Sequence, residues 1–177
     1  FASLLPDKNL DNDVSFSPID DTASNSMHPK IQIPNVVLVG LGAIGNGFIW
    51  SMSKLPDSIG EIDVVEPETV SMSNLQRYVL FEERHVGAAK IDCISDFFTN
   101  PALKINLHRG RWADYLNYKR NWQIENVAVA IDNKRDRIAI QSALPKRIFN
   151  AYTEENLVGI ARHLNFLDAS CLACGYI

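Results

Sequence analysis

The sequence has few cysteines, little excess charge and no long apolar run, and each shortage excludes a class of protein. Three cysteines in 177 residues cannot build the disulfide framework of a small secreted domain, so we expect a reducing, cytoplasmic setting. Seventeen basic and 21 acidic residues give a net charge of −4, which argues against a general nucleic-acid-binding surface. No apolar run approaches the roughly 20 residues of a membrane span. We therefore expect neither a nucleic acid nor a membrane as partner.

The composition is that of a globular protein. Hydrophobic residues make up 46% of the chain, and the length suffices for one α/β domain with a substantial core. Residues 1–30 are rich in Asp, Ser, Asn and Pro and have no sustained hydrophobic period, which predicts a flexible N-terminal arm. Residues 31–177 are then the folded domain. Because the chain begins at Phe1, we expect a processed or excised piece of a longer protein.

The rest of the chain is organised around residues 36–46 (VVLVGLGAIGN), where an apolar strand pattern runs into a glycine turn and then an amphipathic helix pattern. Gly40 permits the tight turn, Gly42 lets the backbone approach a phosphate, and Gly45 lets helix and strand pack closely. The phosphate would meet unpaired N–H groups at the positive end of the helix. The motif predicts a nucleotide without saying which one, and a glycine turn that merely packs is the alternative reading.

An acidic residue ends the next predicted strand, residues 61–66 (EIDVVE). An acid about 20 to 25 positions past the glycines is where a ribose hydroxyl is usually held, so Glu66 is the predicted ribose ligand. An ordinary solvated carboxylate at a strand end is the alternative. Residues 73–77 (SNLQR) then offer the donors Asn74 and Arg77 without negative charge, which suits a triphosphate.

The remaining pattern predicts helices over 87–99, around 112–122 and over 134–143, and strands over 103–108, 126–131 and 149–152. Lys90 would then lie in the first turn of a helix, where a cation is easier to explain if it meets an anion. Asp132 follows a buried strand, in the crevice where ligands of open α/β sheets bind, and it can hold Mg²⁺. Capping the next helix is the alternative role for Asp132, and the two are compatible.

Five short motifs together resemble the ubiquitin-activating enzyme superfamily with its bacterial ThiF and MoeB adenylyltransferases. They are GLGAIG (40–45), EPETV (66–70), SNLQRY (73–78), GAAK (87–90) and IDN (131–133), in the family's order. The resemblance implies a Rossmann-like, doubly wound and mainly parallel sheet with helices on both faces. It also implies ATP-dependent adenylation, with release of pyrophosphate, of the C-terminal glycine carboxylate of a ubiquitin-like protein.

The resemblance also implies roles for individual residues. Gly40, Gly42 and Gly45 would frame the nucleotide, and Glu66 would bind ribose. Asn74, Arg77 and Lys90 would face the phosphates, Asp132 would hold Mg²⁺, and Asn133 would line the nucleotide site. The residues expected to carry catalysis are Arg77, Lys90 and Asp132. Two positions depart from the family pattern: Glu66 replaces the usual Asp, and Tyr78 replaces a Gln and so has no amide to offer a phosphate.

The C-terminal Cys171-x-x-Cys174 is half of a tetrahedral zinc site. The resemblance implies a second cysteine pair further on, so we expect the chain to stop before its other Zn²⁺ ligands. A redox dithiol and ordinary buried cysteines are the alternatives. Arg162-His163 with this motif looks like a prokaryotic subgroup found with ubiquitin-like and conjugating-enzyme-like partners, and family members are typically dimers.

Two functions from other classes remain open. A catalytically silent scaffold subunit would be expected to have lost phosphate ligands, whereas this chain retains Arg77, Lys90 and Asp132. An NAD-dependent oxidoreductase would rest on the glycine motif alone and would leave SNLQR unexplained.

Overall fold

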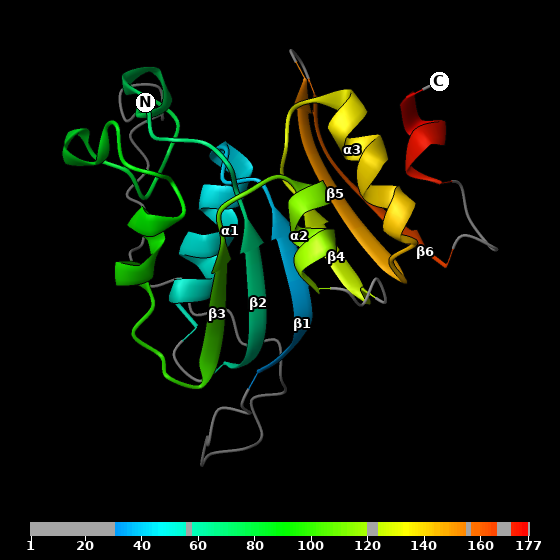
Figure 1. The fold of residues 1–177 in the computed structure, drawn as a ribbon, viewed down its shortest axis with the longest axis horizontal. Helices are drawn as coiled ribbons and strands as arrows, with labels where there is room; N and C mark the ends of the chain where they lie inside the picture. Colours follow the sequence, from blue (N-terminus) through cyan, green and yellow to red (C-terminus); the bar gives the residue numbers. More distant parts are fainter. Residues whose placement is uncertain (1–30, 56–57, 120–123, 155–156, 166–170, 177) are drawn as a thin grey trace, which may run out of the picture.

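A six-stranded sheet forms the centre of the computed structural model, which describes residues 31–55, 58–119, 124–154, 157–165 and 171–176. The strands lie in the order β3-β2-β1-β4-β5-β6 (Figure 1). Their bounds are β1 Gln32–Val39, β2 Ile59–Val65, β3 Leu103–His108, β4 Asn126–Val129, β5 Arg147–Glu154 and β6 Leu157–Leu164. Neighbours pair in parallel except β6, which returns antiparallel to β5. The predicted arm, residues 1–30, lies outside the described residues.

Strand β1 is the point where the order of the sheet reverses. It pairs with β2 on one side and with β4 on the other, and the chain builds outward from it in both directions. In such sheets ligands bind in the crevice beyond the carboxyl ends of the strands at the reversal point. Here those ends are Val39 of β1 and Val129 of β4.

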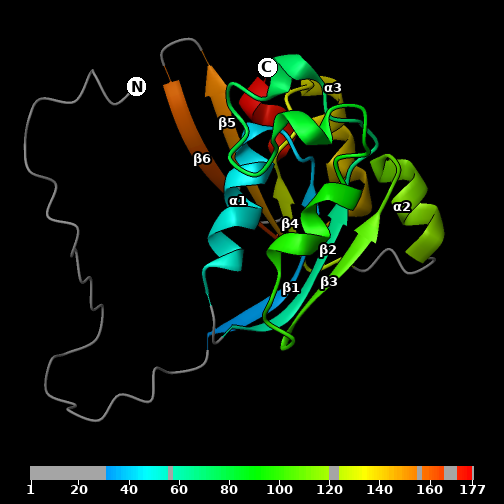
Figure 2. The same ribbon diagram turned by 90° about the vertical axis from the view of Figure 1, so that its left-hand side faces the viewer.

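Both faces of the sheet are covered, as predicted (Figures 1 and 2). Val36 and Leu38 pack with helix α1 (Ala43–Ser53) and residues 70–98 on one face. Val37 and Val39 pack with α2 (Trp112–Lys119), α3 (Lys134–Ile140) and the C-terminal turn on the other. A strand buried on both faces needs a continuous apolar run, which explains the unbroken VVLV before the glycines.

Short 3₁₀ helices lie in the connecting segments: η2 Met72–Asn74, η3 Glu83–His85, η4 Asp92–Phe97, η5 Gln141–Ala143 and η6 Leu172–Tyr176. The predicted helix over 134–143 is α3 continued by η5, and that over 112–122 is described up to Lys119. The last two predicted strands shift: the one over 126–131 ends at Val129, and the one over 149–152 is longer and pairs with β6.

The predicted helix over 87–99 is wrong in its first half. Gly87 has φ +90°, and the backbone of residues 87–90 pairs with residues 68–70 instead of with itself. The Gly87 amide donates to the Val70 carbonyl at 2.9 Å, and the Lys90 amide donates to the Glu68 carbonyl at 3.0 Å. Only η4 is helical, so Lys90 precedes a short 3₁₀ helix rather than lying in the first turn of an α-helix.

Candidate functional site

The glycine turn between β1 and α1 needs two of its glycines for packing. Gly40 has φ +99°, and a Cβ on it would lie 2.6 Å from Ile131 Cγ2 and 2.8 Å from the Ala130 carbonyl oxygen. A Cβ on Gly45 would lie 2.0 Å from the Gly40 carbonyl oxygen. These glycines hold β1, α1 and the end of β4 together, and any side chain at either would force them apart.

Gly42 is different, because the protein leaves room beside it. A Cβ there would meet only the Ala130 carbonyl oxygen, at 3.6 Å, which is an ordinary contact. Gly42 is also the N-cap residue of the 11-residue helix α1, and no side chain caps that helix. Its first N–H groups and the positive end of its dipole are therefore left for an anion. A glycine that packing does not require is explained by a ligand that approaches the backbone closely.

Glu66 lies directly after β2 and is only 3% exposed. Its Oε2 accepts a hydrogen bond from the Leu41 amide at 2.5 Å, and its Oε1 accepts one from the Glu68 amide at 2.8 Å. The carboxylate thus fixes the glycine turn to the end of β2, a structural role that the sequence did not predict. Each carboxylate oxygen can accept a second hydrogen bond, so the predicted contact with ribose remains chemically available.

Lys90 is the most deeply buried charged residue of the site, at 1% exposure. Its Nζ donates to Glu68 Oε2 at 2.6 Å and to the Tyr78 hydroxyl at 3.2 Å. Burial alone would lower the pKa of Lys90, but the hydrogen bond to Glu68, the charge of Glu66 and the Tyr78 hydroxyl together raise that pKa above its usual value. The ammonium therefore keeps its positive charge behind the glycine turn.

Asn74 and Arg77 lie on the crossing segment between β2 and β3, where Asn74 is half-buried and Arg77 is exposed. Asn74 Oδ1 accepts from the Ser71 amide at 3.0 Å, so the amide oxygen shapes η2 while its nitrogen stays available. Arg77 donates to the Ser73 carbonyl at 3.3 Å, and its guanidinium lies 5.5 Å from the centre of the Tyr78 ring. The remaining guanidinium donors have no acceptor in the described part of the chain.

Asn46 is a site residue that sequence reasoning missed. It is fully buried, and its Nδ2 donates to the Leu41 and Gly42 carbonyls at 2.9 and 3.3 Å. Its Oδ1 accepts from the Leu80 amide at 3.3 Å. Asn46 therefore joins the glycine turn to the segment that carries Arg77. The available signal was an amide side chain directly after the third glycine, in the first turn of an otherwise apolar helix.

The sequence left two roles open for Asp132, Mg²⁺ ligand and helix cap, and the structure after β4 separates them. Asn133 is the N-cap of α3, and its Oδ1 accepts from the Asp136 amide at 3.1 Å. Asp132 is exposed, and its carboxylate has no hydrogen bond or ion pair within the described ranges. The cap therefore falls to Asn133, and Asp132 keeps oxygens that fit a divalent cation. Arg137 is buried and donates to Asn150 Oδ1 at 2.9 Å, which ties α3 to β5.

The two C-terminal cysteines form a close pair, with their sulfurs 3.2 Å apart around η6. Hydrogen bonds from the Cys174 thiol and backbone lower the pKa of Cys171 to about 7. Among the residues that the structure describes, no third Cys, His, Asp or Glu joins them to complete a metal site. The predicted zinc site therefore stays a prediction. Cys93 is buried and donates to the Ala89 carbonyl at 3.3 Å, as expected of a packing residue.

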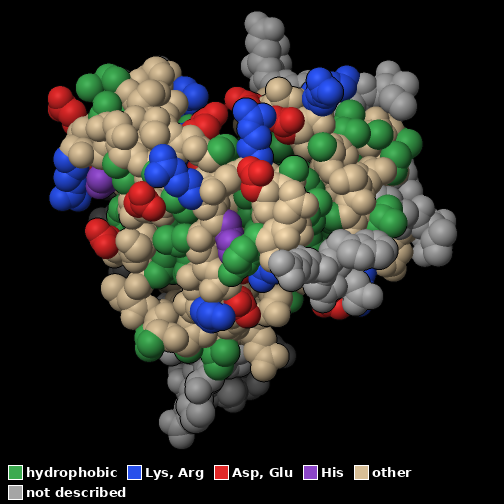
Figure 3. Space-filling model, viewed as in Figure 1, with side chains coloured by type: hydrophobic (Ala, Val, Ile, Leu, Met, Phe, Trp, Pro, Cys, Tyr) green, Lys and Arg blue, Asp and Glu red, His purple; other side chains and the backbone are tan. Residues whose placement is uncertain are grey.

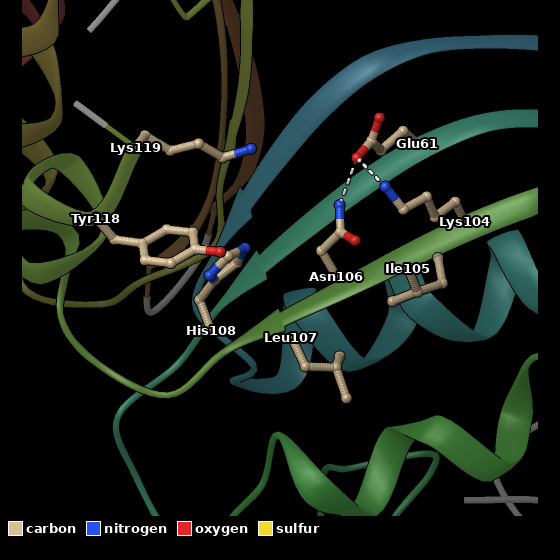
Figure 4. Close-up of a pocket in the computed structure, with 8 residues that line it drawn as sticks. All are labelled: Glu61, Lys104, Ile105, Asn106, Leu107, His108, Tyr118 and Lys119. Carbon is tan, nitrogen blue, oxygen red and sulfur yellow. Dashed lines mark hydrogen bonds and ion pairs between the residues drawn. The ribbon is translucent and has the colours of Figure 1, made fainter. Parts of the chain in front are cut away.

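A groove of about 550 Å³ lies away from the glycine turn, over β3 and α2, and Figure 4 shows the side chains that line it. Its cations are already paired: Lys104 with Glu61 at 3.1 Å, and Lys119 with Asp63 at 2.7 Å. Figure 3 shows charged side chains of both signs interspersed over this face of the molecule, without a broad area of one sign. The unpaired donors of the glycine turn therefore make it the better candidate for an anionic ligand.

Comparisons with known proteins show the family and the fold of the chain. The ThiF family model matches residues 14–162. The chain is 36% identical over 183 residues to protein y4jF of Sinorhizobium fredii, a match that covers 100% of this chain and 35% of that protein. It is 35% identical over 85 residues to the adenylyltransferase and sulfurtransferase UBA4 of Candida albicans, covering 47% and 18%.

Solved structures show the same fold. Escherichia coli MccB, solved with ATP, superposes with a TM-score of 0.63 at 21% identity, covering 76% of this chain and 42% of MccB. The chain thus spans about a third of y4jF and about two fifths of MccB. On the family match and the glycine-turn geometry, the chain belongs to the ThiF family.

Proposed function

We propose that this protein uses ATP to adenylate a carboxylate at the glycine turn. The observation that carries the proposal is the uncapped N-terminus of α1 at Gly42, which opens at the carboxyl ends of β1 and β4. A buried cation, Lys90, and a free carboxylate, Asp132, belong to the segments that border this turn. Anion donors, a cation and a possible Mg²⁺ ligand are the groups that phosphoryl chemistry requires.

In the proposed reaction, an oxygen of the acyl carboxylate attacks the α-phosphorus of ATP. The bond from that phosphorus to the bridging oxygen breaks, and the products are an acyl adenylate and pyrophosphate. Arg77 and Lys90 neutralise the charge that develops on the phosphates, with Asn74 as a neutral donor. Glu66 binds the ribose, Asp132 holds Mg²⁺, and Asn133 lines the site. Little covalent chemistry is asked of the protein itself, so positioning and charge account for catalysis.

The proposed acyl substrate is the C-terminal glycine of a ubiquitin-like protein. This is supported by relatives such as the SUMO-activating enzyme subunit 2 of Dictyostelium discoideum, 31% identical over 97 residues and covering 54% of this chain and 14% of that protein. We also propose a homodimer, a conjugating-enzyme-like partner, Zn²⁺ on Cys171 and Cys174, and a cytoplasmic location. None of the helices within the described ranges is long and apolar enough to cross a membrane.

The test is calorimetric titration of the purified protein with MgATP and, separately, with NAD. Wild type should bind MgATP, and Arg77→Ala should weaken binding about tenfold or more, on the scale of one charged hydrogen bond. Arg84→Ala is the matched control, because Arg84 is an exposed arginine paired with Glu82 on η3. Binding of NAD without ATP would overturn the proposal.

A second assay separates an enzyme from a silent scaffold. Pyrophosphate exchange is measured with a ubiquitin-like protein that ends in a free glycine, using wild type and Asp132→Ala. Exchange that Asp132→Ala lowers by about 10²- to 10³-fold fits catalysis, on the scale of one lost electrostatic contact. Wild-type protein that is folded and binds neither nucleotide would favour the scaffold.

A further inference from the structure

Tyr78 lies between the two cations assigned to the phosphates. Its side chain is buried, at 8% exposure. The hydroxyl accepts a hydrogen bond from Lys90 Nζ at 3.2 Å, and the ring lies 5.5 Å from the guanidinium carbon of Arg77. Lys90 Nζ also lies 5.3 Å from the centre of the same ring. One residue thus contacts a buried ammonium with its hydroxyl and its ring, and an exposed guanidinium with its ring.

The hydroxyl matters for Lys90 because the other acceptor is exposed to solvent. The Glu68 side chain that pairs with Lys90 is 68% exposed, whereas the Lys90 side chain is 2% exposed. An exposed carboxylate can rotate away or bind a cation from solvent. Burial holds the Tyr78 side chain in place, so its hydroxyl oxygen stays beside the Lys90 ammonium as a hydrogen-bond acceptor.

The ring matters for Arg77 because this side chain has few other constraints. Arg77 is exposed and donates one hydrogen bond, to a backbone carbonyl four residues before it. Contact with an aromatic face restricts a guanidinium to fewer orientations and leaves its edge donors free. An amide side chain at position 78 would provide no such surface.

The surrounding core holds Tyr78 itself in place. Its ring packs edge-on against Phe81, with the ring centres 5.6 Å apart. Two residues after Tyr78, the Leu80 amide donates to Asn46 at the glycine turn. These contacts fix the position of Tyr78 relative to the glycine turn that would receive the phosphates.

We propose that Tyr78 is a positioning residue that orients Lys90 through its hydroxyl and Arg77 through its ring, so that both cations face one triphosphate. The inference rests on the proposed function. Tyr78 acts through its two neighbours, and its two ends can be removed separately by substitution.

The experiment measures MgATP affinity by calorimetry in Tyr78→Phe and Tyr78→Gln, each with and without Arg77→Ala. Tyr78→Phe removes only the hydroxyl, so affinity should fall about two- to tenfold, as for one lost hydrogen bond. The further loss caused by Arg77→Ala should be as large in Tyr78→Phe as in wild type. In Tyr78→Gln, which lacks the ring, that further loss should shrink.

Controls keep the result decisive. Tyr118→Phe makes the same chemical change at a tyrosine that is 71% exposed on α2, and it should leave affinity unchanged. Thermal unfolding checks each variant, and Tyr78→Leu replaces Tyr78→Gln if the buried amide unfolds the protein. If Tyr78→Phe binds like wild type and Arg77→Ala costs the same in every background, the inference fails while the proposed function stands. If wild type does not bind MgATP, both fail.

Discussion

Two polar clusters in this protein each surround a buried charge, and they differ in what they leave unpaired. In the first cluster, defined by Asp63, Asn106, Tyr115 and Lys119, the buried carboxylate accepts hydrogen bonds from all three partners at 2.5 to 2.7 Å. In the second, defined by Glu66, Glu68, Tyr78 and Lys90, a buried ammonium is paired. Next to it, and counting only the described residues, the helix end has no side-chain cap, Arg77 gives one side-chain hydrogen bond to a backbone carbonyl, and Asp132 has no partner.

The comparison separates stabilising charge from functional charge. A buried charge whose partners are complete supports the fold and has little to offer a ligand. A buried charge whose neighbours include hydrogen-bond donors without an acceptor can contribute to binding a ligand. The groove beside Asp63 is hollow, but both of its lysines are already paired within the protein, Lys104 with Glu61 and Lys119 with Asp63.

The largest expected effect is on pyrophosphate exchange, when one lysine at each cluster is replaced by methionine. Lys90→Met should lower pyrophosphate exchange by about 10²- to 10³-fold, because it removes the charge that we propose to face the phosphates. Lys104→Met removes an exposed lysine from the edge of the first cluster, where it pairs with Glu61 at 3.1 Å, and should leave exchange unchanged. Equal losses in the two variants would break the comparison.

The next effect is on stability rather than on binding. Asp63→Ala should lower the free energy of unfolding by about 2 to 4 kcal/mol, because it leaves Tyr115 and Lys119 without their buried acceptor. Urea denaturation measures the change. The affinity of the folded variant for MgATP should stay at the wild-type value, and a parallel loss of affinity would mean that the first cluster also serves the site.

A smaller effect is expected at the residue that joins the glycine turn to the crossing segment. Asn46→Ala should cost about 1 to 3 kcal/mol of stability, because it leaves backbone groups of Leu41, Gly42 and Leu80 unpaired. MgATP affinity should also fall, which distinguishes Asn46 from Asp63. An unchanged affinity in calorimetry would make Asn46 purely structural.

The smallest expected effects are on how the free energy of unfolding changes with pH, at the acid limb and at the alkaline limb of the profile. Burial by itself would raise the pKa of Asp63. Hydrogen bonds from Lys119, Tyr115 and Asn106 outweigh burial and lower that pKa below its usual value of 3.8. Its contribution is therefore complete above that value and is lost as pH falls through the folded pKa. The pKa of Lys90 is raised above 10.5, so its contribution is complete below 10.5 and is lost as pH rises through the folded pKa.

Unfolding measured across pH should separate the two clusters at the acid limb. Asp63→Asn should flatten the acid limb, and it should also reduce the alkaline limb, because the hydrogen bond and charge of Asp63 help to raise the pKa of Tyr115. Lys90→Met should reduce the alkaline limb and leave the acid limb, so a loss of the acid limb in Lys90→Met would mean that the two clusters are coupled.

Much of the fold was predictable because it depends on local pattern. The strand before Gly40 and the helix after Gly42 follow from apolar periodicity and glycine placement, whereas the mainly parallel sheet was implied by the resemblance to the family. The roles of the predicted site residues stay predictions, although the helix cap belongs to Asn133 and the Asp132 carboxylate has no partner among the described residues.

What local pattern could not predict depends on distant partners. Residues 87–90 have a helix-like sequence, but their backbone pairs with residues 68–70. The Lys90 ammonium meets a carboxylate 22 residues earlier in the chain, and Asn46 meets an amide 34 residues later. Hydrophobic periodicity carries no information about such pairs, so Lys90 was misplaced and Asn46 was overlooked.

The hydrogen bond from the Leu41 amide to Glu66 has a consequence for how the parts of a nucleotide would bind. The backbone that would receive phosphate and the acid that would receive ribose share one bond, so neither can shift without the other. Groups linked in this way give non-additive free energies. A nucleoside and a polyphosphate offered as separate fragments should therefore bind with a cooperativity that vanishes when Glu66 is shortened to Asp.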